Sequence, residues 1–264
     1  MKIYLPAALF LLSAALLLSM SIKAETPPPA VENYVLTSKE AFKHDMSSYT
    51  QGLFFYNGEM YESAGQYGSS SFRKVDPVTG KVLKSIQFPP EYFAEGSCAV
   101  DGRAYVLTWK EGLCMVYDLT SFVKLAEFRY SGEGWGLTTD GKSLIMSNGT
   151  STLSFRDPMT FLEQHTLQVR LDGKPVQFLN ELEYIDGKIW ANVYGLDFIV
   201  IIDPATGNVT GRIDCRGLLD AKYRTRNIDV FNGIAYNPED NSIYLTGKYW
   251  PIIYKVTIKR AEDE

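Results

Sequence analysis

The sequence predicts an all-β protein: a five-bladed β-propeller of four-stranded antiparallel blades, closed by an N-terminal strand that completes the last blade. Three observations predict this fold. Tight-turn dipeptides recur along the chain, and a second family of turns follows them at a nearly constant offset. The last repeat also lacks a strand that the N-terminal segment can supply. Four-stranded units that repeat every ~40–45 residues are typical of propeller blades.

The first family of turns consists of Asn-Gly or Asp-Gly dipeptides spaced 44, 39 and 46 residues apart. Such dipeptides favour two-residue β-hairpin turns, because both central positions of these turns need a positive φ. We therefore expect each dipeptide to join the first two strands of a repeat. The four dipeptides are Asn57-Gly58, Asp101-Gly102, Asp140-Gly141 and Asp186-Gly187.

The second family of turns starts 19, 17, 17 and 17 residues after the first, at Asp76, Asp118, Asp157 and Asp203. Segments with Asp, Pro, Thr and Gly between apolar runs are typical of turns. Each repeat is therefore expected to form four strands in antiparallel succession. In the second repeat these strands are residues 96–100, 103–109, 113–117 and 123–129.

A fifth repeat starts at Asn232, with strands at 242–249 and 252–258, but it has no second Asp turn and no fourth strand. The segment from Tyr34 to Phe42 is an unassigned strand that precedes the first repeat. We expect it to form the outer strand of the fifth blade, because this arrangement removes the open edges of an incomplete ring. The propeller domain would then span residues 34–260, followed by a tail at 261–264.

The first 24 residues have the pattern of a signal peptide. Lys2 is followed by an apolar run at 3–18 and by a small-residue stretch in which cleavage after Ala24 is expected. Residues 25–33 are then a proline-containing linker. These features predict a secreted or periplasmic protein, and the alternative is an uncleaved N-terminal anchor. A net charge of −5 without a basic cluster argues against nucleic acid or an anionic membrane as the partner. We expect a monomer with no membrane attachment after cleavage.

The three cysteines are expected to be free. Cys98 and Cys114 fall on the first and third strands of one blade, about 10 Å apart at the usual strand spacing, which is beyond disulfide reach. Cys215 falls two blades away.

The repeat also predicts a site at one mouth of the ring, where the first strand of each blade starts and the second ends. A mouth that collects a carboxylate, amides, an ammonium and aromatic rings has the composition of a small concave site. The positions six before each tight turn are Gln51, Glu95, Gly134 and Asn180. The positions eight after it are Gly65, Trp109, Asn148 and Tyr194, with Lys248 as their fifth-blade equivalent. The positions eight before it are Tyr49, Phe93, Gly132 and Phe178.

Glu95 is the only carboxylate among these positions. Glu133 and Glu181 are each displaced by one residue, and strand alternation is expected to turn them away. His44 and His165 both fall on predicted outermost strands, so a histidine-based zinc site is not expected. We expect neither a metal nor a cofactor.

Eight motifs, in order, resemble the glutaminyl-peptide cyclotransferase family of the plant and bacterial type. The resemblance covers residues 34–258 and implies a five-bladed propeller, in agreement with the repeat count. The motifs are Tyr49-Thr-Gln-Gly-Leu53, Phe93-Ala-Glu-Gly96, Thr108-Trp-Lys110, Gly132-Glu-Gly-Trp-Gly-Leu137, Leu179-Asn-Glu-Leu-Glu183, Ile189-Trp-Ala-Asn-Val193, Asn232-Gly-Ile-Ala-Tyr236 and Thr246-Gly-Lys-Tyr-Trp-Pro251.

The resemblance implies an enzyme that converts the N-terminal Gln of peptides or proteins to pyroglutamate and releases ammonia. It implies that Glu95 shuttles the proton. It further implies that Gln51, Asn180 and Lys248 hold the substrate between walls formed by Phe93, Trp109 and Trp135. This sequence departs from the family pattern at two walls, with Tyr49 where Phe is usual and Tyr194 where Trp is usual, so pocket size and substrate preference can differ.

Two other functions fit a propeller with this mouth. The first is a non-catalytic propeller that binds a peptide or a protein partner. The second is a calcium-dependent hydrolase, for which Glu95, Asn148 and Asn180 would supply oxygen ligands. Ammonia release from a Gln-initiated dipeptide, with and without a chelator, discriminates between the three.

Overall fold

The computed structural model describes Met1 and residues 30–261. The predicted signal peptide, apart from Met1, therefore lies outside the described residues, as do residues 262–264 of the predicted tail. The described part of the chain holds no helix of the length and apolarity needed to cross a membrane.

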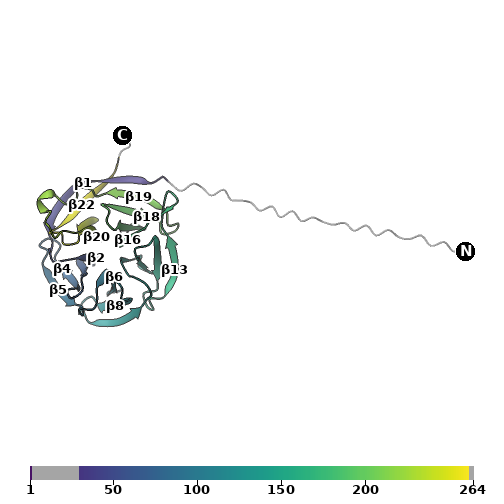
Figure 1. The fold of residues 1–264 in the computed structure, drawn as a ribbon, viewed down its shortest axis with the longest axis horizontal. Helices are drawn as coiled ribbons and strands as arrows, with labels where there is room; N and C mark the ends of the chain where they lie inside the picture. The colour runs from purple at the N-terminus through teal and green to yellow at the C-terminus, as the bar shows by residue number, and fades with distance from the viewer. Residues whose placement is uncertain (2–29, 262–264) are drawn as a thin grey trace.

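Five blades surround a central axis, with the inner strands β2, β6, β16 and β20 near the centre and β1, β5 and β13 at the periphery (Figure 1). Blade 1 comprises β2 (Thr50–Tyr56), β3 (Glu59–Ala64), β4 (Ser71–Val75) and β5 (Val82–Gln87). Blade 2 comprises β6 (Ala94–Val100), β7 (Arg103–Thr108), β8 (Leu113–Asp118) and β9 (Lys124–Arg129). Blade 3 comprises β10 (Leu137–Thr139), β11 (Leu144–Met146), β12 (Thr152–Arg156) and β13 (Glu163–Gln168).

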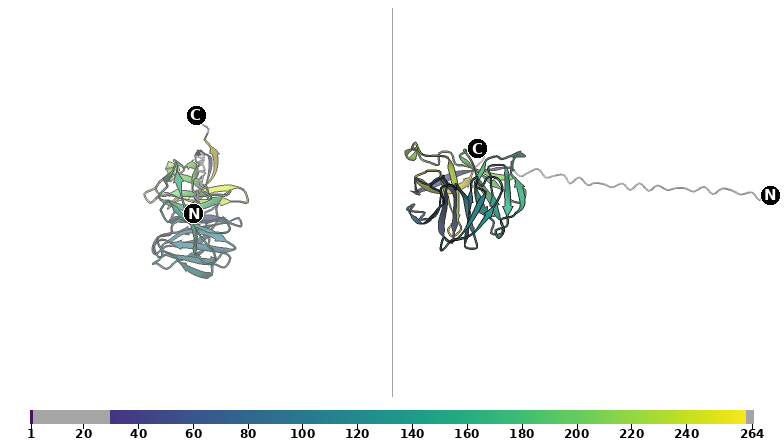
Figure 2. Two further views of the ribbon diagram at one scale, coloured as in Figure 1. Left: turned by 90° about the vertical axis from the view of Figure 1, so that its right-hand side faces the viewer. Right: turned by 60° about the horizontal axis from the view of Figure 1, so that its bottom comes forward.

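The last two blades share one continuous sheet. Blade 4 comprises β16 (Leu179–Ile185), β17 (Lys188–Val193), β18 (Phe198–Ile202) and β19 (Val209–Asp214). Blade 5 comprises β20 (Phe231–Asn237), β21 (Ser242–Gly247), β22 (Ile252–Arg260) and, as its outer strand, β1 (Glu32–Lys43). A short hairpin of β14 (Arg170–Leu171) and β15 (Lys174–Pro175) links blades 3 and 4, and a 3-10 turn, η1 (Ala221–Tyr223), precedes β20. The turned views show the strands running from one face of the ring toward the other (Figure 2).

Burial falls from the axis outward, as expected for blades packed face to face. The inner strand β6 is buried along nearly its whole length, whereas the outer strand β9 alternates between exposed and half-buried positions. Aromatic rings fill the space between adjacent blades. Phe72 on β4 stacks with Tyr117 on β8, at a centroid separation of 6.4 Å and an interplanar angle of 15°. All three cysteines are free, as predicted, and the structure buries each of them.

The predicted closure by the N-terminal strand is confirmed, and the strand does more than the sequence indicated. β1 pairs antiparallel with β22 from Tyr34 to Lys43. Its first residues, Glu32–Val35, also pair in parallel with Gly211–Asp214 of β19. The strand therefore joins blade 5 to blade 4, and Figure 1 shows it lying beside both β19 and β22.

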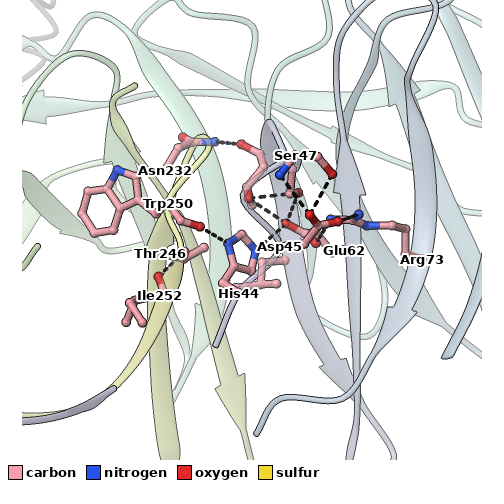
Figure 3. A network of polar contacts seen from close by, with 12 residues as sticks. His44, Asp45, Ser47, Glu62, Arg73, Asn232, Thr246, Trp250 and Ile252 are labelled. Carbon is pink, nitrogen blue, oxygen red and sulfur yellow. Dashed lines mark hydrogen bonds and ion pairs between the residues drawn. The ribbon is translucent and has the colours of Figure 1, made fainter. Parts of the chain in front are cut away.

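A buried polar network holds the end of this closing strand (Figure 3). His44 lies one residue past β1, where Nδ1 contacts Trp250 O at 2.7 Å and Nε2 contacts Glu62 Oε1 at 3.0 Å. Arg73 pairs with the other oxygen of Glu62 and with Asp45. The network thus joins blade 5, β1 and blade 1. The prediction that His44 lies on an outermost strand is wrong, because the chain turns inward after Lys43. His165 does lie on the outer strand β13, where it stacks on Phe155.

Three of the four predicted tight turns are two-residue hairpins with positive φ at both positions. These are Asn57-Gly58, Asp101-Gly102 and Asp186-Gly187. The turn in blade 3 differs from the prediction. Thr139 pairs with Leu144, so the loop has two more residues, and Asp140 caps it by accepting the N–H groups of Lys142 and Ser143.

Candidate active site

A cavity of about 280 Å³ opens on the face of the ring where the inner strands begin. Its walls include all nine residues that the sequence placed at the mouth as site residues, together with Gln66. The lining residues are Tyr49, Gln51, Gln66, Phe93, Glu95, Trp109, Trp135, Asn180, Tyr194 and Lys248.

The polar floor comes from equivalent positions in three blades. Gln51, Glu95 and Asn180 are each the second residue of an inner strand, β2, β6 and β16 respectively. In each strand the pairing register shifts across this residue, for example between Thr50 and Gly52 in β2. A β-bulge re-aims a side chain and often lies beside an active site. Here the three bulges bring three polar groups into one cavity, and each group is almost fully buried.

A glycine after two of these residues lets neighbouring inner strands approach closely. A Cβ on Gly52 would lie 2.5 Å from Ser97 N, and one on Gly96 would lie 2.4 Å from Leu137 N. Both distances are too short for any side chain. Gln51 and Glu95 are therefore each followed by a glycine that lies in close contact with the next blade.

Glu95 has one side-chain hydrogen bond, from Gln51 Nε2 to Glu95 Oε1 at 3.1 Å. Only 4% of Glu95 is exposed. Burial raises the pKa of this carboxyl well above its ordinary value; Lys248 opposes the shift, and Glu133 and Glu111 add to it. The other amide atom of Gln51, Oε1, is buried and has no hydrogen-bond partner within the described residues. The cavity thus holds a carboxyl group that can carry a proton and an acceptor that awaits a donor.

Lys248 is held over two tyrosine rings. Its Nζ lies 4.5 Å from the ring centroid of Tyr49 and 5.3 Å from that of Tyr194. Burial lowers the pKa of this ammonium below its ordinary value, against the opposing charges of Glu95 and Asp229. The two rings are the ones at which the sequence departs from the family pattern. The hydroxyl of Tyr49 donates a hydrogen bond to Asp229 Oδ2 at 3.1 Å.

The remaining walls are aromatic rings in edge contact. Phe93 lies 5.5 Å from Trp109 and 6.1 Å from Tyr49, and Trp135 lies 5.8 Å from Tyr194, as centroid separations. Edge-to-face pairs at such distances are favourable and set the tilt of each ring. The cavity is therefore a shaped aromatic box with polar groups at its base.

Five positions counted from the repeat do not line the cavity: the three glycines Gly65, Gly132 and Gly134, together with Asn148 and Phe178. Asn148 is exposed and accepts hydrogen bonds from Thr150, because the longer turn of blade 3 shifts the following strand by two residues. Phe178 is 56% exposed and does not line the cavity. Sequence reasoning missed Gln66, which follows the mouth position Gly65 and has a φ of 114°. Its backbone conformation left no signal in the sequence.

The rival carboxylates are turned away from the cavity, as predicted. Glu181 points toward the interior of the ring, where its two oxygens accept Leu53 N at 3.2 Å and Ile234 N at 2.9 Å. Glu133 lies behind the walls, against two indole rings. Within residues 30–261, no three His, Cys, Asp or Glu side chains gather in an arrangement that could hold a metal ion.

Comparisons with known proteins agree with this site and this fold. A sequence model described as glutamine cyclotransferase matches residues 10–258. A glutaminyl-peptide cyclotransferase of Arabidopsis thaliana is 42% identical over 226 residues, which are 83% of this chain and 70% of that protein. The crystal structure of Myxococcus xanthus glutaminyl cyclase matches 88% of this chain and 100% of its own, with a TM-score of 0.83 and 34% identity. The resemblance inferred from the eight motifs is therefore confirmed, and this chain belongs to the glutamine cyclotransferase family.

Proposed function

We propose that this protein converts the N-terminal glutamine of peptides and proteins to pyroglutamate with release of ammonia, and that Glu95 is its proton shuttle. The observation that carries the proposal is the isolation of Glu95. It is the only carboxylate in the cavity, it is buried, and it lies beside an unpaired amide oxygen and a buried ammonium. Membership in the glutamine cyclotransferase family supports the same chemistry.

The reaction is intramolecular, so the enzyme needs to fold one side chain and move protons. The aromatic box excludes water and holds the glutamine side chain bent toward its own α-amine. The reacting atoms are thus held in a geometry suitable for attack, which lowers the entropic cost of the reaction. The α-amino nitrogen attacks the side-chain carbonyl carbon, and the new C–N bond closes a five-membered ring. The bond from that carbon to the amide nitrogen then breaks, and this nitrogen leaves as ammonia.

One carboxyl group can serve both proton transfers. Glu95 takes a proton from the attacking amine and delivers it to the departing nitrogen. The raised pKa of Glu95 suits the first transfer, because a carboxylate with a raised pKa is the stronger base and takes the amine proton more readily. Gln51 Oε1 would accept a hydrogen bond from an N–H of the α-amine, and this bond would give the buried oxygen a partner.

Negative charge develops on the carbonyl oxygen during the attack. Lys248 and Asn180 are the buried donors in the cavity that can stabilise this oxygen. The lowered pKa of Lys248 reflects burial, and a buried cation stabilises a developing anion more strongly than a solvated one does. No metal ion or cofactor is needed for any of these steps.

We propose that the enzyme is exported. The sequence of residues 1–24 supports a signal peptide and a secreted or periplasmic location, and an uncleaved anchor at the same segment is the alternative. We propose a monomer whose open mouth accepts the N-terminus of a longer chain. Peptide-mass analysis of the mature N-terminus after export decides between cleavage after Ala24 and retention.

The direct test measures ammonia from a Gln-initiated dipeptide, with and without a chelator, and identifies pyroglutamate by a mass loss equal to ammonia. We expect release that the chelator does not affect. Binding of the dipeptide without ammonia release would instead support a non-catalytic propeller, and release that stops in chelator would support a metal-dependent hydrolase.

A further inference from the structure

Two walls of the cavity share one hydrogen-bond acceptor that lies outside the cavity. Trp109 Nε1 donates to Glu133 Oε2 at 2.8 Å, and Trp135 Nε1 donates to the same oxygen at 3.0 Å. Trp109 follows β7 in blade 2, and Trp135 precedes β10 in blade 3. A single carboxylate oxygen therefore joins walls that belong to different blades.

The backbone around Glu133 is fixed from both sides. Gly134 N donates to Trp109 O at 2.9 Å, and Trp135 O accepts Gly96 N at 2.6 Å. A Cβ on Gly134 would lie 2.2 Å from the hydroxyl of Tyr130, so only glycine allows the loop to lie this close to blade 2. Glu133 is thus carried by a loop that cannot shift away from the two indole rings without breaking these contacts.

The other ring contacts of the two indoles leave their orientation less well defined. Trp109 meets Phe93 edge-on, and Trp135 meets Tyr194 edge-on. Such contacts set the tilt of a ring, but they are weaker than the hydrogen bond from an N–H donor to a charged acceptor, which is short and aligned. A half-buried indole N–H also requires an acceptor. Glu133 meets this requirement for both rings at once.

Glu133 also acts on Glu95 through charge. Six titratable groups interact electrostatically with Glu95: the ammonium of Lys248, the carboxylates of Glu133 and Glu111, and the phenols of Tyr49, Tyr67 and Tyr130. Burial is the main cause of the raised pKa of Glu95, Lys248 lowers that pKa, and the two carboxylates raise it further. Removing either carboxylate should therefore lower the pKa of Glu95.

We propose that Glu133 is a positioning residue for the cyclisation, which fixes Trp109 and Trp135 in one mutual orientation around the glutamine side chain. This inference rests on the proposed function, because it concerns the walls of the same cavity. Glu133 does not line the cavity and acts on the substrate through the two rings.

The test uses two variants of the full-length enzyme. Glu133→Gln keeps the size of the side chain and one acceptor oxygen but removes the charge, and Glu133→Ala removes both acceptors. We expect kcat/KM for a Gln-initiated dipeptide to fall about 10–100-fold, mainly through a higher KM, because misplaced walls orient the substrate poorly. The near-ultraviolet circular dichroism of the tryptophans should change, and the acid limb of the pH profile of kcat/KM should move to lower pH.

Glu111→Gln is the matched control. Glu111 also raises the pKa of Glu95, but it bonds the Tyr67 hydroxyl at 2.9 Å and makes no hydrogen bond to either indole N–H. We expect this variant to move the acid limb in the same direction, with KM and the near-ultraviolet spectrum unchanged.

Three results would overturn the proposal. One is a KM within about twofold of the parent in both Glu133 variants, well short of the expected loss. Another is an unchanged near-ultraviolet spectrum in both. The third is a Glu111→Gln variant that reproduces the full effect, since charge alone would then suffice. The spectrum is recorded without substrate, so it tests the ring positions even if the parent releases no ammonia, which would refute the proposed function instead.

Discussion

Gln51 donates a hydrogen bond of 3.1 Å from Nε2 to Glu95 Oε1, and this bond joins the inner strands of blades 1 and 2 at the floor of the cavity. The oxygen of the same amide is buried and has no hydrogen-bond partner in the part of the chain that the structure describes. A side chain that orients the carboxylate with one atom and offers a free acceptor with the other is well suited to hold an amine next to a proton shuttle.

Glu95→Gln should abolish turnover and leave the fold intact. The amide keeps the shape and hydrogen-bonding capacity of the carboxyl but carries no titratable proton, and the loss of acid–base help typically costs about 10²–10⁴ in rate. Ammonia release under saturating peptide measures the effect, and the thermal melting temperature checks the fold. A variant within about threefold of the parent rate would remove Glu95 from the mechanism, since that change is far below the expected loss.

Glu181→Gln is the control for this experiment. Both oxygens of Glu181 accept backbone N–H groups, so an amide places an NH₂ group against one of these donors. We expect a loss of stability of about 1–3 kcal/mol with kcat retained. A dead but stable Glu181→Gln variant would mean that the proton shuttle is this residue.

Lys248→Met should move the acid limb of the kcat/KM profile to higher pH. The ammonium lowers the pKa of Glu95, so its removal lets burial raise that pKa further. Loss of the cation should also lower kcat, because the carbonyl oxygen loses a donor. Lys110→Met is the matched control. Its ammonium covers the Trp109 ring at 3.7 Å from the centroid, and we expect its removal to leave the limb in place.

A chain that begins at residue 46 should fail to fold, whereas one that begins at residue 31 should be stable. The first lacks β1 and leaves the edges of β19 and β22 unpaired, and such edges are prone to aggregation. The second retains β1 entirely. Circular dichroism and size-exclusion chromatography of the two purified chains make the comparison. A monomeric, active chain from residue 46 would contradict the closure by β1.

The network around His44 should stabilise the fold most between about pH 4.5 and pH 6.5, the ordinary pKa values of its carboxyl and imidazole groups. Burial opposes the charging of His44, but Glu62 outweighs it and raises the pKa of the imidazole. The contribution of His44 to the stability of the fold is therefore complete below the ordinary histidine pKa. It is lost as the pH rises through the raised pKa of the folded protein. Glu62 has a lowered pKa, because Arg73 and His44 outweigh its burial. Its contribution is complete above the ordinary pKa and is lost in acid.

The melting temperatures of the parent and of His44→Gln, compared across pH, test this window. We expect the difference to be largest near pH 5–6 and to shrink above neutral pH, following the linkage between protonation and stability. A difference that grows toward alkaline pH would show that His44 acts as a neutral imidazole.

Most of the site could be predicted because the repeat fixes the start of each inner strand relative to its turn. Gln51, Glu95 and Asn180 each precede a two-residue turn by the same number of residues, so one count places all three. The count fails at Asn148, since Asp140 and Gly141 belong to a longer loop that a dipeptide pattern cannot distinguish from a two-residue turn.

Other features depend on contacts between elements far apart in the sequence. The parallel pairing of Glu32–Val35 with β19 has no local signal, because any exposed strand can accept it. The inward position of His44 likewise arises only once the blades pack together, and so do the hydrogen bonds from the two indoles to Glu133. Glu133 does lie outside the cavity, but strand alternation is not the cause, because Glu133 belongs to the loop before β10 and accepts hydrogen bonds from two indoles behind the walls.

The pairing of the first strand with the last has a consequence for the order in which the molecule is assembled during synthesis. β1 leaves the ribosome first, whereas β22, its antiparallel partner, leaves last, about two hundred residues later in the sequence. Blades 1 to 3 contain their own four strands and can form as the chain lengthens. The ring itself closes only after β22 has been made, and such long-range pairing slows folding. A translation product that ends before β22 therefore lacks the antiparallel partner of its first strand, and ring closure reports that β22 has been made.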